Sequence, residues 1–121
     1  MFKDALQEIL NRTEGSLGVL IMGLDGIPVE RAWRDDEFRS NFDIAVAEYT
    51  SLIKKANQSN GDTGLGGLNE ITVSNRNAVF IMRLLGDDYF LALIMSPEGN
   101  FGRGRYELRK AELQMEHEFV I

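Results

Sequence analysis

The sequence predicts an α+β fold, a sandwich in which one antiparallel sheet of five strands carries helices on both faces. Residues 17–24 and 89–95 are apolar on both strand faces, so they are expected in the middle of a covered sheet. Short turns separate neighbouring strands and make those pairs antiparallel. Residues 2–14, 35–56 and 101–119 carry apolar side chains at helical spacing and supply the covering helices.

The first helix is followed by a strand hairpin. Gly15-Ser16 is expected to end the helix. Asp25-Gly26 is a strong signal for a two-residue hairpin turn, because both residues accept positive φ. The second strand, residues 27–33, contains Pro28, which has no N–H for a strand partner. That strand is therefore expected at a sheet edge.

The second helix has an unusually broad apolar surface. Asp35-Asp36 is expected to open it, since acidic residues suit the positive end of a helix. Its apolar stripe steps by four and three residues and comprises Phe38, Phe42, Ala45, Tyr49, Leu52 and Ala56. Val46 and Ile53 widen this stripe, and Ile44 and Ala47 add apolar surface elsewhere, which is more than one sheet contact requires. Residues 57–67 are polar and glycine-rich and are expected to form a loop.

Three strands are expected next, at residues 68–74, 78–85 and 89–95. The first and fifth strands of the chain are the wholly apolar ones, so they should lie side by side. This gives the element order α-β-β-α-β-β-β-α and the strand order 2-1-5-4-3.

Bulk composition narrows the class of protein. A length of 121 residues favours one domain, residues 1–121, and the absence of cysteine excludes disulfides and thiolate metal sites. The formal charge of −6 disfavours nucleic acid, and the densest basic group (Arg103, Arg105, Arg109, Lys110) shares its helix with acidic residues. No apolar run approaches the about 20 residues of a membrane span. The N-terminal segment lacks the apolar region of a signal peptide, so we expect a cytoplasmic protein.

Several motifs are candidates for chemical sites. Residues 61–67 resemble a phosphate loop in glycine content but lack its lysine and precede a strand, which favours a simple connection. Residues 99–104 open a helix and allow anion capture in principle, although a plain helix start is favoured. Residues 35–37 suit a cation or an acidic helix start, and His117 stands among acidic residues. We expect no catalytic, cofactor-binding or metal-binding residue.

The chain resembles the roadblock family, which includes dynein light chains and bacterial MglB-type proteins. The segments that carry the resemblance are "GVLIMGLDGIPVERA", "AVFIMRLLGDDYFLALIM" and "PEGNFGRGRYELRK", together with the element and strand order. The likeness spans essentially the whole sequence. Its motifs are turn glycines and apolar strands, which mark the fold better than any chemistry.

The resemblance implies a homodimer joined through the second helix and the third strand. The residues expected at that interface are Phe42, Val46, Tyr49, Ile53, Ile71 and Val73. An unpaired edge strand with Ile71 and Val73 would also invite aggregation unless covered. The alternative is that Val46, Ile53 and Ile44 pack beneath the glycine-rich loop within one subunit.

The resemblance further implies a non-enzymatic regulator of a small Ras-like GTPase, which would dock on the paired second helices. Helical spacing suggests Arg39, Asp43, Ala47 and Thr50 as contacts. Arg31, Arg34 and Arg39 are the candidates for an arginine finger, although solvation or pairing with Asp35, Asp36 and Glu37 is favoured. The alternative function is a non-catalytic scaffold for motor, signalling or membrane-associated complexes.

Overall fold

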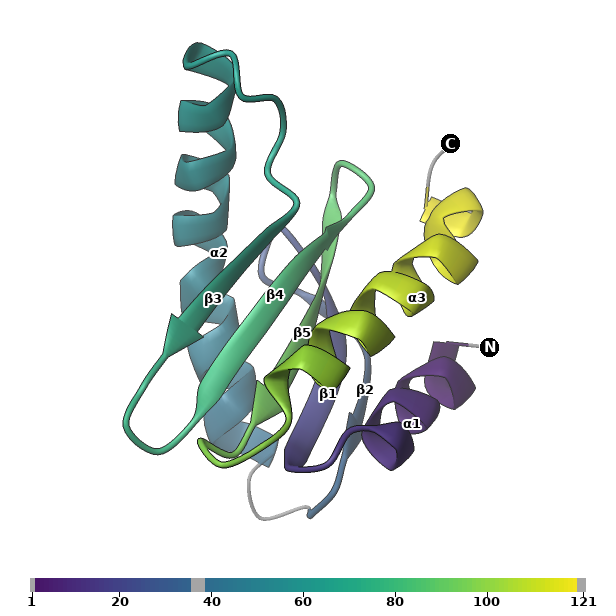
Figure 1. The fold of residues 1–121 in the computed structure, drawn as a ribbon. Helices are drawn as coiled ribbons and strands as arrows, with labels where there is room; N and C mark the ends of the chain where they lie inside the picture. The colour runs from purple at the N-terminus through teal and green to yellow at the C-terminus, as the bar shows by residue number, and fades with distance from the viewer. Residues whose placement is uncertain (1, 36–38, 120–121) are drawn as a thin grey trace.

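The computed structural model describes residues 2–35 and 39–119, and in these residues the chain forms three helices and five strands (Figure 1). The helices are α1 (Phe2–Arg12), α2 (Arg39–Asp62) and α3 (Phe101–Phe119). The strands are β1 (Ser16–Gly23), β2 (Pro28–Trp33), β3 (Glu70–Ser74), β4 (Val79–Leu85) and β5 (Tyr89–Met95).

The sheet has the order β2-β1-β5-β4-β3, and all neighbouring strands are antiparallel. The predicted fold class, element order and strand order are therefore confirmed. Figure 1 shows α2 on one face of the sheet and α1 with α3 on the other. Both faces of β1 and β5 are covered, and nearly all of their side chains are buried, as wholly apolar strands require.

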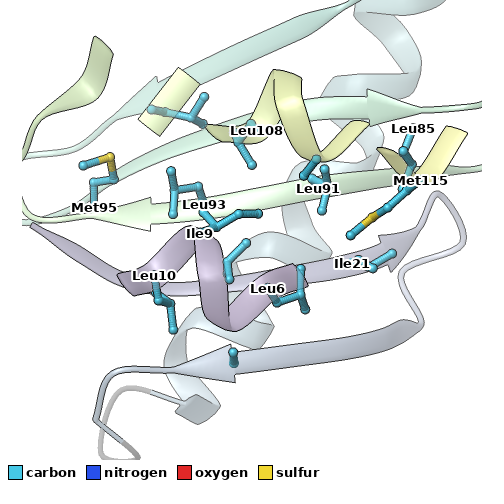
Figure 2. Packing of buried hydrophobic residues seen from close by; sticks show 14 of the residues in the cluster. Leu6, Ile9, Leu10, Ile21, Leu85, Leu91, Leu93, Met95, Leu108 and Met115 are labelled. Carbon is cyan, nitrogen blue, oxygen red and sulfur yellow. The ribbon is translucent and has the colours of Figure 1, made fainter. Parts of the chain in front are cut away.

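Two apolar cores lie on opposite faces of the sheet. Figure 2 shows the first core, in which Leu6, Ile9 and Leu10 of α1 and Leu108 and Met115 of α3 meet the sheet. The second core joins the sheet to α2 and includes Leu20, Val46, Ile53, Phe80 and Phe90. The helices α1 and α3 therefore pack on one face of the sheet through the first core, and α2 packs on the other face through the second core.

The ends of two helices differ from the sequence prediction. The helix α2 continues to Asp62, so the predicted loop is wrong over residues 57–62. Asn57 accepts a hydrogen bond from the backbone N–H of Leu68 at 2.7 Å, and this long-range bond supports a polar segment as helix. The helix α1 ends at Arg12, two residues before the predicted end at Glu14. The predicted helix start at Asp35 is wrong, because Asp35 lies in a bend before α2. Asp36, Glu37 and Phe38, which the prediction also placed in this helix, lie outside the described residues.

Candidate protein-interaction surface

The strand β3 leaves one of its edges without a strand partner in the described part of the chain. It pairs with β4 alone, from Glu70 opposite Arg83 to Ser74 opposite Val79. Ile71 and Val73 are half-buried and pack against the core on the α2 side of the sheet. The open edge therefore borders apolar side chains that are covered from one side only.

The helix α2 and the loop that follows it carry exposed apolar side chains of their own. Ile44 is 61% exposed and Leu52 is 43% exposed, and Leu65 in the following loop is exposed as well. Large exposed apolar side chains that gather on one element indicate an interaction surface more strongly than scattered ones. We call the set Ile44, Leu52, Leu65, Ile71 and Val73 the edge surface.

The residues predicted for a dimer interface divide into two groups. Val46 and Ile53 are 0% exposed within one subunit, where they pack against the sheet, so they have no surface left to offer a second subunit. Phe42 and Tyr49 are half-buried, and each ring lies against Phe80 with centroids 5.9 and 5.2 Å away. Val46 and Ile53 thus pack against the sheet and not beneath the glycine-rich loop, whereas Ile44 is exposed.

Three of the residues suggested as GTPase contacts, Asp43, Ala47 and Thr50, lie on the flank of α2 rather than on its outermost face. Asp43 forms an ion pair with Arg31 of β2 at 3.3 Å, and Thr50 donates its hydroxyl hydrogen to the backbone oxygen of Ala47 at 2.7 Å. Ala47 and Thr50 are half-buried, and the side chain of Arg39 lies outside the described part. The exposed positions of the helix that periodicity did not select include Ile44, Glu48, Ser51 and Lys55.

Two of the arginine-finger candidates are held by structural contacts. Arg31 pairs with Asp43, and its backbone oxygen accepts a hydrogen bond from Lys3. Arg34 donates to the backbone oxygens of Leu10 and Ser16, both at 2.6 Å, and to the Ser16 hydroxyl at 2.8 Å. Arg34 thereby closes the C-terminal end of α1. Pairing with Asp36 or Glu37 lies outside the described residues.

The glycine-rich motifs have structural explanations. Gly64 and Gly66 adopt positive φ in an exposed connection between α2 and β3. At the start of α3, Asn100 accepts a hydrogen bond from the N–H of Arg103 at 3.0 Å, which is the contact of a helix N-cap. A Cβ on Gly104 would lie 2.9 Å from side-chain atoms of Leu93 and Met95, so glycine permits close packing there.

No group of three or more His, Asp or Glu side chains among the described residues is placed to hold a metal ion. The side chain of His117, the single histidine, lies outside that part of the chain. Lys54, Asp25 and Asp88 line an open hollow of about 450 Å³ at the hairpin turns, with no arrangement of a nucleophile and a base.

A covered sheet, an open edge at β3 and exposed apolar side chains on a helix are features typical of protein-interaction domains. The crystal structure of MglC from Myxococcus xanthus matches it at 30% sequence identity and a TM-score of 0.72, over 95% of this chain and 96% of that chain. The chain belongs to the roadblock family.

Two further structures share the fold at lower identity. A Roadblock/LC7 domain from Streptomyces avermitilis has a TM-score of 0.82 at 14% identity, over 97% of this chain and 96% of that chain. The gliding protein MglB from Thermus thermophilus has a TM-score of 0.79 at 13% identity, over 94% of this chain and 84% of that one. No model of a protein family matches the sequence, and no curated protein matches it.

Membership of the roadblock family supports a role in protein interaction and GTPase regulation. Among the described helices, none is both long and apolar enough to cross a membrane.

Proposed function

We propose that residues 1–121 form one roadblock-type domain that works as a homodimer, joined through β3 and α2, and regulates a small Ras-like GTPase docked on the paired α2 helices. The observation that carries this proposal is the edge surface, which combines the unpaired edge of β3 with exposed Ile44 and Leu52 on α2. Pairing β3 with β3 of a second copy would satisfy the free backbone groups and cover Ile71 and Val73.

The GTPase would supply the whole nucleotide site. The chain carries no P-loop sequence, and Arg31 and Arg34 are committed to contacts within the fold. Stimulation of hydrolysis would then come from holding the partner's own catalytic groups in place. Positioning of such groups is a main source of the rate enhancement in phosphoryl transfer. The exposed side of α2, with Glu48, Ser51 and Lys55, is the surface available for this contact in each subunit.

The test is capture of partners from the source cell with tagged protein, in the presence of either a GTP analogue or GDP, read by mass spectrometry. A Ras-like GTPase enriched with the GTP analogue supports the proposal, and its hydrolysis rate with and without the chain then measures regulation. A matched capture uses the double variant Glu48→Lys and Lys55→Glu, which reverses two exposed charges on α2 and should lose the GTPase. Partners that ignore nucleotide, with no GTPase among them, would favour a non-catalytic scaffold instead.

A further inference from the structure

The outer side of α3 carries a surface that neither the proposed dimer nor the proposed GTPase contact uses. We define the α3 ridge as Arg103, Tyr106, Arg109, Lys110 and Leu113, which recur at helical spacing. Tyr106 is 57% exposed and Leu113 is 53% exposed. Figure 1 shows α3 on the sheet face opposite α2, so the ridge points away from the paired helices of the proposed dimer.

On this helix a buried acidic side chain lies beneath basic side chains that reach the surface. Glu107 is 1% exposed and lies beneath two cations, with its oxygens 2.9 Å from Nη2 of Arg103 and 3.4 Å from Nζ of Lys110. One buried carboxylate therefore serves two cations. Opposite charges at such spacing cancel only in part, because the carboxylate is covered and the cations reach solvent. The outward surface is positive although the whole chain has a formal charge of −6.

A second group of charges repeats this arrangement on the neighbouring flank. Glu112 accepts hydrogen bonds from Arg83 at 2.6 Å and from Arg109 at 2.8 Å. The Arg109 side chain is half-exposed, whereas the side chains of Arg83 and Glu112 are mostly covered. Among the described side chains of α3, Glu116 is the exposed acidic one.

The aromatic side chain is placed among these cations. The Arg103 guanidinium lies 5.4 Å and the Lys110 ammonium 5.9 Å from the centre of the Tyr106 ring. These contacts hold both cations beside an exposed ring, so the side chains lose less freedom when a partner binds. Tyrosine and arginine are also the residues that contribute most at protein interfaces.

We propose that the α3 ridge docks an acidic segment of a partner protein, with carboxylates on Arg103, Arg109 and Lys110 and an apolar side chain against Tyr106 and Leu113. Charge complementarity selects this occupant, since the ridge is a basic strip on an acidic protein. Two copies of the chain, each with a formal charge of −6, repel one another overall, and this disfavours a second copy as the occupant. A homodimer would present two ridges and bind a partner with two acidic segments more tightly through linkage.

The test is selection from a displayed library of random peptides on the purified full chain, without prior choice of ligand. The expected result is enrichment of peptides with Asp and Glu around Leu, Phe or Trp. Affinity of the selected peptides should fall as salt is raised, because the contact charges are partly exposed. Absence of acidic enrichment would overturn the proposal.

Variants locate the selected peptides on the ridge. Tyr106→Ala with Leu113→Ser changes exposed side chains only and should weaken binding at least about tenfold. Arg109→Gln should also weaken it, while Glu112 keeps its contact with Arg83. The matched controls are Ile27→Ser with Val29→Ser, also exposed, and Arg12→Gln on α1.

The same variants separate a protein partner from a membrane. Vesicles of phosphatidylcholine with phosphatidylserine are mixed with the wild-type chain and the ridge variants and then floated. The proposal expects no flotation beyond that of neutral vesicles. Peptides that bind the ridge variants as well as the wild type, or vesicles that bind the ridge in place of peptides, would overturn it. None of these outcomes depends on a GTPase, so they are distinguishable from failure of the proposed function.

Discussion

Nη2 of Arg31 lies 3.3 Å from Oδ2 of Asp43, and this ion pair joins the edge strand β2 to the N-terminal half of α2. The side chains of both residues are mostly covered. The ring of Trp33 lies 6.0 Å from that of Phe42, beside the ion pair on the same two elements. The ion pair and the ring contact thus join β2 to the same part of α2.

Replacing Arg31, Arg34 and Arg39 by alanine should lower stability while leaving any stimulation of GTP hydrolysis largely intact. Loss of the Arg34 hydrogen bonds to Leu10 and Ser16 removes charged donors from buried acceptors, at a cost of about 2–3 kcal/mol. Thermal unfolding measures this cost, and single-turnover hydrolysis at a temperature where the variant is folded measures the stimulation.

Arg76→Ala is the control for that experiment, because Arg76 is exposed at the turn between β3 and β4. Arg34→Lys should recover only part of the stability, since one ammonium does not reproduce the fork of a guanidinium. A loss of several hundredfold in kcat from a folded variant would instead identify an arginine finger.

Replacing Ile71 and Val73 by lysine should convert the proposed dimer into a monomer. Two ammonium groups beside an unpaired edge oppose strand pairing, which is how monomeric sheets protect their edges. Light scattering after size-exclusion chromatography measures the mass. Ile27→Lys with Val29→Lys places the same change at the opposite side of the sheet, near β2, and should leave the mass unchanged. A double variant at Ile71 and Val73 that keeps the mass of a dimer would remove β3 from the interface.

The strand order followed from the sequence because β1 and β5 are apolar on both faces, a pattern that only a central position explains. The sequence did not predict the rotation of α2 about its axis, that is, which side of the helix faces the sheet. Its apolar side chains cover much of its circumference, so periodicity alone does not separate buried Val46 and Ile53 from exposed Ile44 and Leu52. The sheet makes that choice through contacts such as those of Phe42 and Tyr49 with Phe80.

Contacts between distant segments account for the other differences. In the segment 57–62, Asn57 accepts a hydrogen bond from Leu68, which lies eleven positions further along the chain. The role of Arg34 depends on the end of α1 lying beside β1. The basic group on α3 was visible in the sequence, but Glu70, which pairs with Arg105, comes from β3. Arg83, which shares Glu112 with Arg109, comes from β4. The outward positive charge of this basic group arises because Glu107 is buried while the basic side chains reach solvent. The local sequence does not show which of these side chains will be buried.

Neighbouring residues on α2 separate the monomer core from the proposed interface. Ile53→Ala should destabilise each subunit by about 2–5 kcal/mol, because the side chain is fully buried against the sheet. Leu52→Ala should leave the core unchanged and weaken association instead. Denaturant unfolding at several protein concentrations distinguishes the two, since only an effect on association varies with concentration. A concentration-dependent loss for Ile53→Ala alone would show that the interface, not the core, holds that residue.

Two glycines with nearly the same backbone conformation should respond differently to alanine. Gly15 has φ of +85° and Gly26 has φ of +86°, so both substitutions carry the left-handed penalty of about 1–2 kcal/mol. A Cβ on Gly15 would lie 2.4 Å from Cα of Gly99, whereas a Cβ on Gly26 meets nothing within 4 Å. Ser96 donates to Gly15 O at 2.8 Å and Asn100 to Glu14 O at 3.0 Å, so the two turns are unable to separate without breaking these bonds.

Gly15→Ala should therefore cost clearly more than Gly26→Ala, and urea unfolding of both variants in one buffer measures the difference. The excess comes from the backbone overlap alone, because the conformational penalty is shared. Loss of the bonds from Ser96 and Asn100 should also speed amide hydrogen exchange at those two residues in Gly15→Ala. Equal free energies of unfolding for the two variants would mean that the turns of Gly15 and Gly99 move apart freely, which would release the start of α3 from the end of α1.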